Sequence, residues 1–123
     1  EWASAFAKLG LRRSMAIARL SLAAALRPGR REGAVEELRL AVGAAGPSPY
    51  CCGRAEEKLS GNELCPATAR LVAEAVGEEV AGRLGARPSA PYKREAVKGL
   101  VWDVLERLAR KSWGDAWWRR TFG

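Results

Sequence analysis

The sequence predicts an α+β domain, with strands in the N-terminal half and helices in the C-terminal half. Two patterns lead to this prediction. Residues 66–84 and 89–111 repeat apolar side chains at spacings of three and four, which is typical of amphipathic helices. Residues 38–42 alternate between apolar and other side chains, which is typical of a half-buried strand. The chain has 123 residues, enough for one domain with one sizeable core.

The last predicted helix covers about residues 89–111. Ser89 can cap its first turn, and Pro91 lies where a helix tolerates proline. Charged residues, Lys93 among them, take most positions outside the apolar stripe, so we expect them to face solvent. The stripe expected to be buried consists of Ala96, Val97, Leu100, Val101, Val104, Leu105 and Leu108.

A second helix is predicted over about residues 66–84, with Gly85 where a C-terminal cap is expected. A shorter helix over residues 54–59 lies between two glycines. The expected buried face of the longer helix consists of Leu71, Val72, Ala75, Val76, Val80 and Leu84.

The first half of the chain leaves one alternative open. Residues 15–26 are rich in alanine and leucine, which favours a helix by intrinsic propensity. From Leu20 onward, however, the leucines alternate with small or polar residues, which favours a strand. Residues 27–30 then supply a turn, so residues 15–26 and 38–42 can form a β-hairpin.

Composition and charge exclude several classes of protein. The formal net charge of +7 is spread along the chain without a long basic run, so we expect a solvated surface of mixed sign. No stretch approaches the roughly 20 apolar residues of a membrane span. No basic and apolar leader is present at the N-terminus. We expect a cytoplasmic protein without a membrane partner.

Residue types needed for a self-contained active site are missing. The chain has no histidine, which removes the commonest general base and nitrogen metal ligand. Cys51, Cys52 and Cys65 match no zinc or iron–sulfur spacing, so we expect small, partly buried thiols and no metal site. A disulfide from Cys65 to one of the other two is the alternative. No glycine-rich phosphate-binding loop occurs.

Four segments in order resemble the C-terminal domain of the FAD-binding medium subunit of molybdenum hydroxylases, the carbon monoxide dehydrogenase and xanthine dehydrogenase flavoprotein family. They are SAFAKLGLRRSMAIA at residues 4–18, ELRLAVGAAGPSP at 37–49, RAEEKLSG at 54–61 and RPSAPYKRE at 87–95. Two departures stand out: Met15 occupies a position where an acid is common in the family, and Tyr50-Cys51-Cys52 replaces the usual valine and arginine.

The resemblance implies a small antiparallel sheet of about three strands in the N-terminal half, covered by about three helices in the C-terminal half. It therefore makes residues 14–27 a strand. It assigns residues 1–112 to the flavoprotein domain and leaves residues 113–123 as a tail rich in tryptophan and arginine. We expect this tail to fold back onto the core or to contact a partner subunit, in preference to nucleic acid.

The resemblance also implies a function. In this family FAD is held mainly by an upstream domain, and the C-terminal domain closes one side of the flavin site. The same domain contacts the iron–sulfur small subunit of a complex that also contains a molybdopterin large subunit. Electrons pass from molybdenum through iron–sulfur clusters to FAD. We therefore expect this chain to be part of an oxidoreductase, without catalytic residues or a tightly bound cofactor of its own.

By resemblance, four residues approach the flavin: Phe6, Lys8, Arg12 and Arg13. Lys8 is the first candidate for a cation near the N1–C2=O end, where it would stabilise the anionic reduced ring. Arg12 and Arg13 are, in the alternative interpretation, surface charges before a strand. The alternative function is a stand-alone basic interaction module that binds protein or nucleic acid. An apolar face left open in the isolated domain would favour a homo-oligomer.

Overall fold

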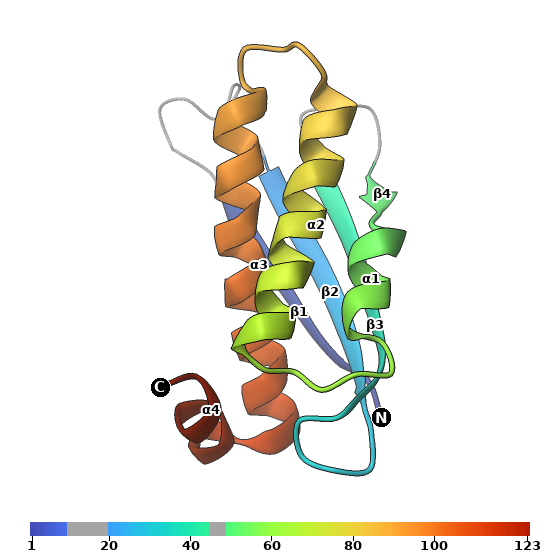
Figure 1. Cartoon of the computed structure of the whole chain (residues 1–123), viewed down its shortest axis with the longest axis vertical. Helices are drawn as coiled ribbons and strands as arrows, with labels where there is room; N and C mark the ends of the chain where they lie inside the picture. Colours follow the sequence, from blue (N-terminus) through green and yellow to red (C-terminus); the bar gives the residue numbers. More distant parts are fainter. Residues whose placement is uncertain (10–19, 45–48) are drawn as a thin grey trace.

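The computed structural model describes residues 1–9, 20–44 and 49–123. Strands come first and helices follow, with the helices stacked on one face of a single sheet (Figure 1). The strands are β1 (Ala3–Leu9), β2 (Leu20–Pro28), β3 (Val35–Ala44) and β4 (Tyr50–Cys51). The helices are α1 (Gly53–Leu59), α2 (Pro66–Leu84), α3 (Ala90–Trp113) and α4 (Asp115–Phe122).

The sheet is antiparallel throughout, and its strands lie in the order of the sequence, β1-β2-β3-β4. The predicted α+β class and the division into a strand half and a helix half are confirmed. The described residues contain four strands and four helices instead of about three of each. We predicted residue ranges for two strands only, which correspond to β2 and β3. Of the other two strands, β4 is only two residues long, and β1 comes from residues for which we predicted no secondary structure.

The alternative left open for residues 15–26 is resolved in favour of a strand from Leu20 onward, while residues 10–19 lie outside the described part. Leu22 and Leu26 are fully buried on the side that faces the helices. The free energy gained by burying these leucines is larger than the preference of the surrounding alanines for a helix, so the segment forms a strand. The predicted hairpin is present, because β2 pairs with β3 along its whole length.

The long helices follow their predicted bounds within about two residues. Gly85 caps α2 as predicted, with a φ of +61° that favours glycine. Ser89, by contrast, makes no side-chain capping bond; its carbonyl oxygen instead accepts the Lys93 amide at 2.9 Å. None of the helices in the described ranges is long and apolar enough to cross a membrane.

Two assignments of buried and exposed helix faces were wrong. Leu71 was placed on the buried face of α2 but is 48% exposed. The buried side of α2 is rotated toward Ala69, Ala73 and Gly77, because α2 lies between α1 and α3 and contacts both (Figure 1). Lys93 was placed on the solvent side of α3 but is only 3% exposed, which a long aliphatic stem allows. Ala75 and Ala96, expected in the core, are half-buried.

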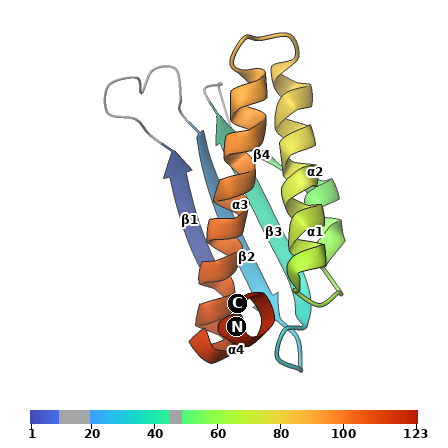
Figure 2. The same cartoon turned by 60° about the vertical axis from the view of Figure 1, so that its left-hand side comes forward.

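The tail folds back onto the domain, one of the two arrangements expected for it. Trp117 of α4 is only 7% exposed and lies against the turn between β2 and β3. A Cβ at Gly33 of this turn would come within 3.0 Å of the Trp117 ring, and Gly33 has a φ of +86°. Glycine is therefore required there for two independent reasons. Figure 2 shows both chain ends near this turn, away from the turn that joins α2 and α3.

The buried stripe of α3 yields the first stability prediction. Leu105 is fully buried against the sheet, so Leu105→Ala should lower the free energy of unfolding by about 2–5 kcal/mol through lost contacts and a cavity. Urea denaturation followed by circular dichroism measures the loss. Leu71→Ala, at the exposed position of α2, is the matched control and should cost much less. Equal losses for the two variants would show that the two helix faces are wrongly assigned.

The contact between Trp117 and Gly33 yields a second prediction. Trp117→Ala should lower the free energy of unfolding by about 3–5 kcal/mol, because a large buried ring is removed. The exposed Arg119 lies on the same short helix, and Arg119→Ala should change stability by no more than about 0.5 kcal/mol. If Trp117→Ala unfolds at the same urea concentration as the unsubstituted chain, the tail does not contribute to the core.

Candidate functional site

The candidate site is the face of the sheet that the helices leave uncovered, called here the outer face. Side chains alternate between the two faces of a strand, and on β1–β3 the rows of buried residues all point toward the helices. The outer face therefore carries the other half of each strand. From β1 to β3 its rows are Ser4, Phe6 and Lys8; Ser21, Ala23, Ala25 and Arg27; and Glu37, Arg39, Ala41 and Gly43.

Phe6 and Lys8, two of the four predicted flavin-contacting residues, lie on this face. Phe6 is 54% exposed and pairs with Ala23, while Lys8 is exposed and pairs with Ser21. Neither neighbour is large enough to cover the side chain beside it. The structure thus brings Phe6 and Lys8 together on one accessible surface, and Arg12 and Arg13 lie outside the described residues.

Side chains of α3 hold the outer edge of β1 in place. The Arg107 guanidinium donates to the Phe6 carbonyl oxygen at 2.7 Å, and the Lys111 ammonium donates to that of Ser4 at 2.6 Å. Bonds from a charged donor are stronger than those between neutral groups. Arg107 is itself fixed by Asp103 at 2.9 Å. The backbone that presents Phe6 and Lys8 is therefore anchored to the helix layer.

A second cluster on the outer face was not predicted. The guanidinium carbons of Arg27 and Arg39 lie 5.5 and 5.8 Å from the centre of the Trp2 ring, within cation–π range. Glu37 accepts hydrogen bonds from both arginines, at 3.3 Å from Arg27 and 2.8 Å from Arg39. The hydrogen bond from Arg39 is the largest cause of the lowered pKa of Glu37. Trp2 and both arginines are exposed and Glu37 is half-buried at the surface, so we assign the cluster little stability of its own.

Beside Arg39 the outer face is hollowed and largely apolar. An open hollow of about 220 Å³ is lined mainly by small side chains, among them Ala23, Ala25 and Ala41. Arg39, Glu56 and the exposed Cys51 also line it, and the Glu56 carboxylate accepts the Leu40 amide at 2.8 Å. It contains no convergent set of polar groups that would orient a small polar ligand.

The three cysteines are free and differ in their surroundings. Burial raises the pKa of the Cys52 thiol to about 12, so it stays protonated at neutral pH. Cys65 is the N-cap residue of α2. Hydrogen bonds from Thr68, above all from its backbone amide and then from its side chain, lower the pKa of the Cys65 thiol. The expected partly buried thiols fit Cys52 and Cys65, whereas Cys51 is exposed. Within the described ranges, no group of three potential ligands is close enough to hold a metal ion.

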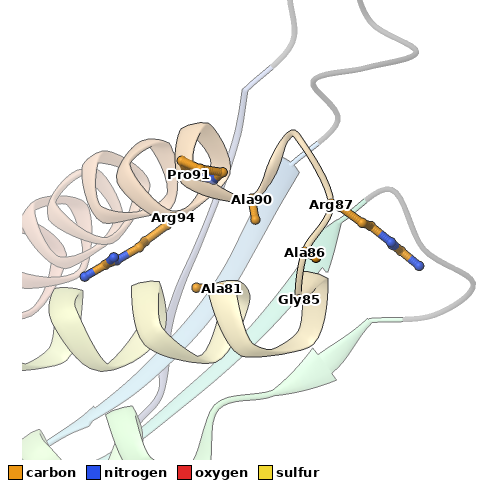
Figure 3. A pocket seen from close by; sticks show the side chains of 7 residues that line it. All are labelled: Ala81, Gly85, Ala86, Arg87, Ala90, Pro91 and Arg94. Atoms are coloured by element: carbon orange, nitrogen blue, oxygen red, sulfur yellow. The ribbon is translucent and has the colours of Figure 1, made fainter.

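Another hollow, of about 330 Å³, lies at the turn between α2 and α3 (Figure 3). Two arginines contribute to its lining, but their guanidinium groups point away from one another and out of the hollow: Arg87 to one side and Arg94 to the other. The remaining lining consists of alanine, glycine and proline. We therefore do not assign it a ligand.

Comparisons with known proteins agree with this architecture. Residues 4–108 match the family described as the CO dehydrogenase flavoprotein C-terminal domain. A putative xanthine dehydrogenase FAD-binding subunit of Escherichia coli is 30% identical over 111 residues, which is 90% of this chain and 37% of that protein. A second E. coli protein, from strain O157:H7, is a xanthine dehydrogenase FAD-binding subunit with the same identity and coverage. The chain thus spans little more than a third of these relatives.

Solved structures share the fold. Quinoline 2-oxidoreductase from Pseudomonas putida 86 superposes with a TM-score of 0.71 at 23% identity, over 89% of this chain and 38% of its own. Carbon monoxide dehydrogenase from Hydrogenophaga pseudoflava superposes with a TM-score of 0.63 at 19% identity, over 85% and 36%. Because the family match covers most of the strands and helices, the chain belongs to the CO dehydrogenase flavoprotein C-terminal domain family.

Proposed function

We propose that this chain is the C-terminal domain of the FAD-carrying subunit of a molybdenum-containing hydroxylase, and that its outer face lies beside the flavin site. The observation that carries the proposal is the family match over residues 4–108, which includes β1 with its exposed Phe6 and Lys8. The E. coli relatives are FAD-binding subunits, and the chain covers about 37% of each. On this proposal the chain contributes to an oxidoreductase without an active site of its own.

The described residues fit contact with one edge of a flavin rather than enclosure of a whole FAD. When bound, FAD supplies electron acceptance and transfer. Lys8 offers an ammonium group that would stabilise negative charge at the N1–C2=O end of the ring. Phe6, two residues away on the same face, offers an apolar surface for the ring to rest against. Neither of these two hollows has converging donors for a pyrophosphate, and the rest of the FAD would be held elsewhere.

Arg12 and Arg13 remain predictions for additional cations near the same ring. They follow β1 in the sequence and precede β2, outside the described residues. Their role in the proposal rests on the family resemblance alone.

The proposed partners are those of the larger enzyme. They are the upstream FAD-binding part, an iron–sulfur small subunit and a molybdopterin large subunit. One structural relative is a Cu,Mo-CO dehydrogenase, and it superposes with a TM-score of 0.69. Electrons would pass from molybdenum through iron–sulfur clusters to the flavin, and the substrate would bind to another subunit.

The alternative, a basic module for nucleic acid, has less support from the described residues. Many of their arginines form ion pairs with carboxylates instead of lining an open basic groove. The arginines paired in this way include Arg27, Arg31, Arg83, Arg107, Arg110 and Arg120. The positive charge of these arginines is therefore compensated locally by neighbouring carboxylates.

Substitution of Lys8 tests the flavin contact. In the whole subunit, Lys8→Met should lower the midpoint potential of bound FAD by roughly 20–80 mV, because a cation at about 4 Å contributes about 1–4 kcal/mol and 1.4 kcal/mol corresponds to about 30 mV in a two-electron couple. Spectroscopic redox titration measures the shift. Lys58→Met, at an exposed position of α1, is the matched control and should leave the potential unchanged. Identical potentials for the Lys8 and Lys58 variants would refute the assignment of Lys8.

A further inference from the structure

We propose that Arg107 of α3 is a positioning residue for the flavin contact. Its guanidinium bonds to the backbone of β1 at Phe6 and thereby sets the distance between the Lys8 ammonium and the flavin ring. This inference rests on the proposed function, in which Lys8 lies beside the flavin. It adds a residue of the helix layer that acts on the flavin only through the position of Lys8.

The strand β1 is weakly held by its own side chains. It lies at the edge of the sheet and pairs only with β2. Ala7 is its only buried residue, and a single methyl group buries little apolar surface. On the outer face, Phe6 and Lys8 stand opposite Ala23 and Ser21, whose side chains are too short to restrain them. A contact that must be held within about 0.5 Å therefore needs support from elsewhere.

The helix α3 lies against β1 and provides this support (Figure 2). The Arg107 guanidinium donates to the Phe6 carbonyl oxygen at 2.7 Å, and the Lys111 ammonium donates to that of Ser4 at 2.6 Å. Four residues of a helix rise about 6 Å, and two residues of a strand rise about 6.8 Å. The donors on α3 and the acceptors on β1 therefore match in spacing, with the helix and the strand running in opposite directions.

The series of donors on α3 ends at the level of Lys8. One turn before Arg107 the helix carries Asp103, whose carboxylate has no proton to give to a carbonyl oxygen. Asp103 instead accepts a hydrogen bond from Arg107 at 2.9 Å. Arg107 is thus held at two points, because one terminal nitrogen bonds to Phe6 and the other to Asp103. Of the two bonds from α3 to β1, the one from Arg107 lies closer to Lys8 along the strand.

The expected effect on the flavin follows from distance. Coulomb energy varies inversely with distance, so a cation that moves from about 4 Å to about 6 Å from a negative charge loses about a third of its interaction. Loss of the bond from Arg107 removes the restraint on β1 that lies nearest to Lys8. The charge of Arg107 is itself paired with Asp103, which limits its direct effect on the flavin. Arg107 therefore acts through the backbone of β1.

Substitution of Arg107 in the whole subunit tests the inference. Arg107→Met should lower the midpoint potential of bound FAD by about a third or more of the shift that Lys8→Met causes, measured by spectroscopic redox titration. Arg107→Lys keeps a donor and should restore the potential, since Lys111 already reaches a carbonyl oxygen of β1 from α3. Arg94→Met removes the same charge from an exposed position of α3 and should leave the potential unchanged. An unchanged potential in Arg107→Met overturns the inference.

A double variant separates positioning from a direct effect of charge. If Arg107 acts through Lys8, the variant with both Lys8→Met and Arg107→Met should have the potential of Lys8→Met alone, because no cation remains to be positioned. Two shifts that add would show that Arg107 acts on the flavin by itself, and they overturn the inference. Lys111→Met removes the bond that lies farther from Lys8 and should shift the potential less than Arg107→Met. Equal shifts from these two variants also count against the inference.

Hydrogen exchange measures the first step, the restraint of β1, without reference to the flavin potential. In the whole subunit, Arg107→Met should speed the exchange of the β1 amides by about threefold or more, because a hydrogen bond from a charged donor is lost. The amides of β3, which Arg107 does not contact, should exchange at an unchanged rate. Unchanged exchange in β1 overturns the inference.

The same titrations distinguish failure of this inference from failure of the proposed function. If Lys8→Met shifts the potential and Arg107→Met does not, the Lys8 contact stands and the positioning role of Arg107 fails. If neither substitution shifts the potential, the Lys8 contact and the positioning role fail together.

Discussion

The packing of one apolar row of the sheet against the helix layer, α3 over β2 and α1 over β3, determines most other features of this domain. Leu22, Leu26, Leu38 and Leu40 point to the same side of β2 and β3 and are almost completely buried there. Since the alternation of a strand has a period of two, this row fixes the register of both strands. It also confines the core to one side of the sheet, so the helices form a single layer and the opposite side stays uncovered.

A sheet with helices on one face has two edges and one uncovered face. Side chains of the helices bond to the two edges but do not cover that face. The helices supply side chains to both edges: cations from α3 to the carbonyl groups of β1, and acceptors from α1 to the amides of β3. Two backbone groups at each edge are therefore already bonded to side chains, which makes the edges less open to an added strand. The two edges therefore receive side chains from the helices of the domain itself, whereas the described residues leave the outer face open.

Much of the fold could be predicted from the sequence, because the three-four spacing in the helices and the alternation in β2 and β3 report burial directly. Leu71 and Lys93 were misplaced because a single helix does not reveal how many neighbours surround it. The strand β1 was missed because its buried side chains are mostly alanines, which give a weak pattern. In the candidate site, Phe6 and Lys8 were predicted from the family resemblance. The cluster around Trp2 could not be predicted, because its residues come together only when three strands pair.

The contact between Trp117 and Gly33 has a consequence for exchanging parts among relatives. Trp117 lies beyond residue 108, where the family match ends, whereas Gly33 lies within it. Any larger side chain at position 33 would collide with the indole ring. A chimera without the final helix would expose the turn between β2 and β3, against which that ring packs. The turn between β2 and β3 and the helix α4 therefore depend on one another. A chimera built from this domain should take both of them from the same protein.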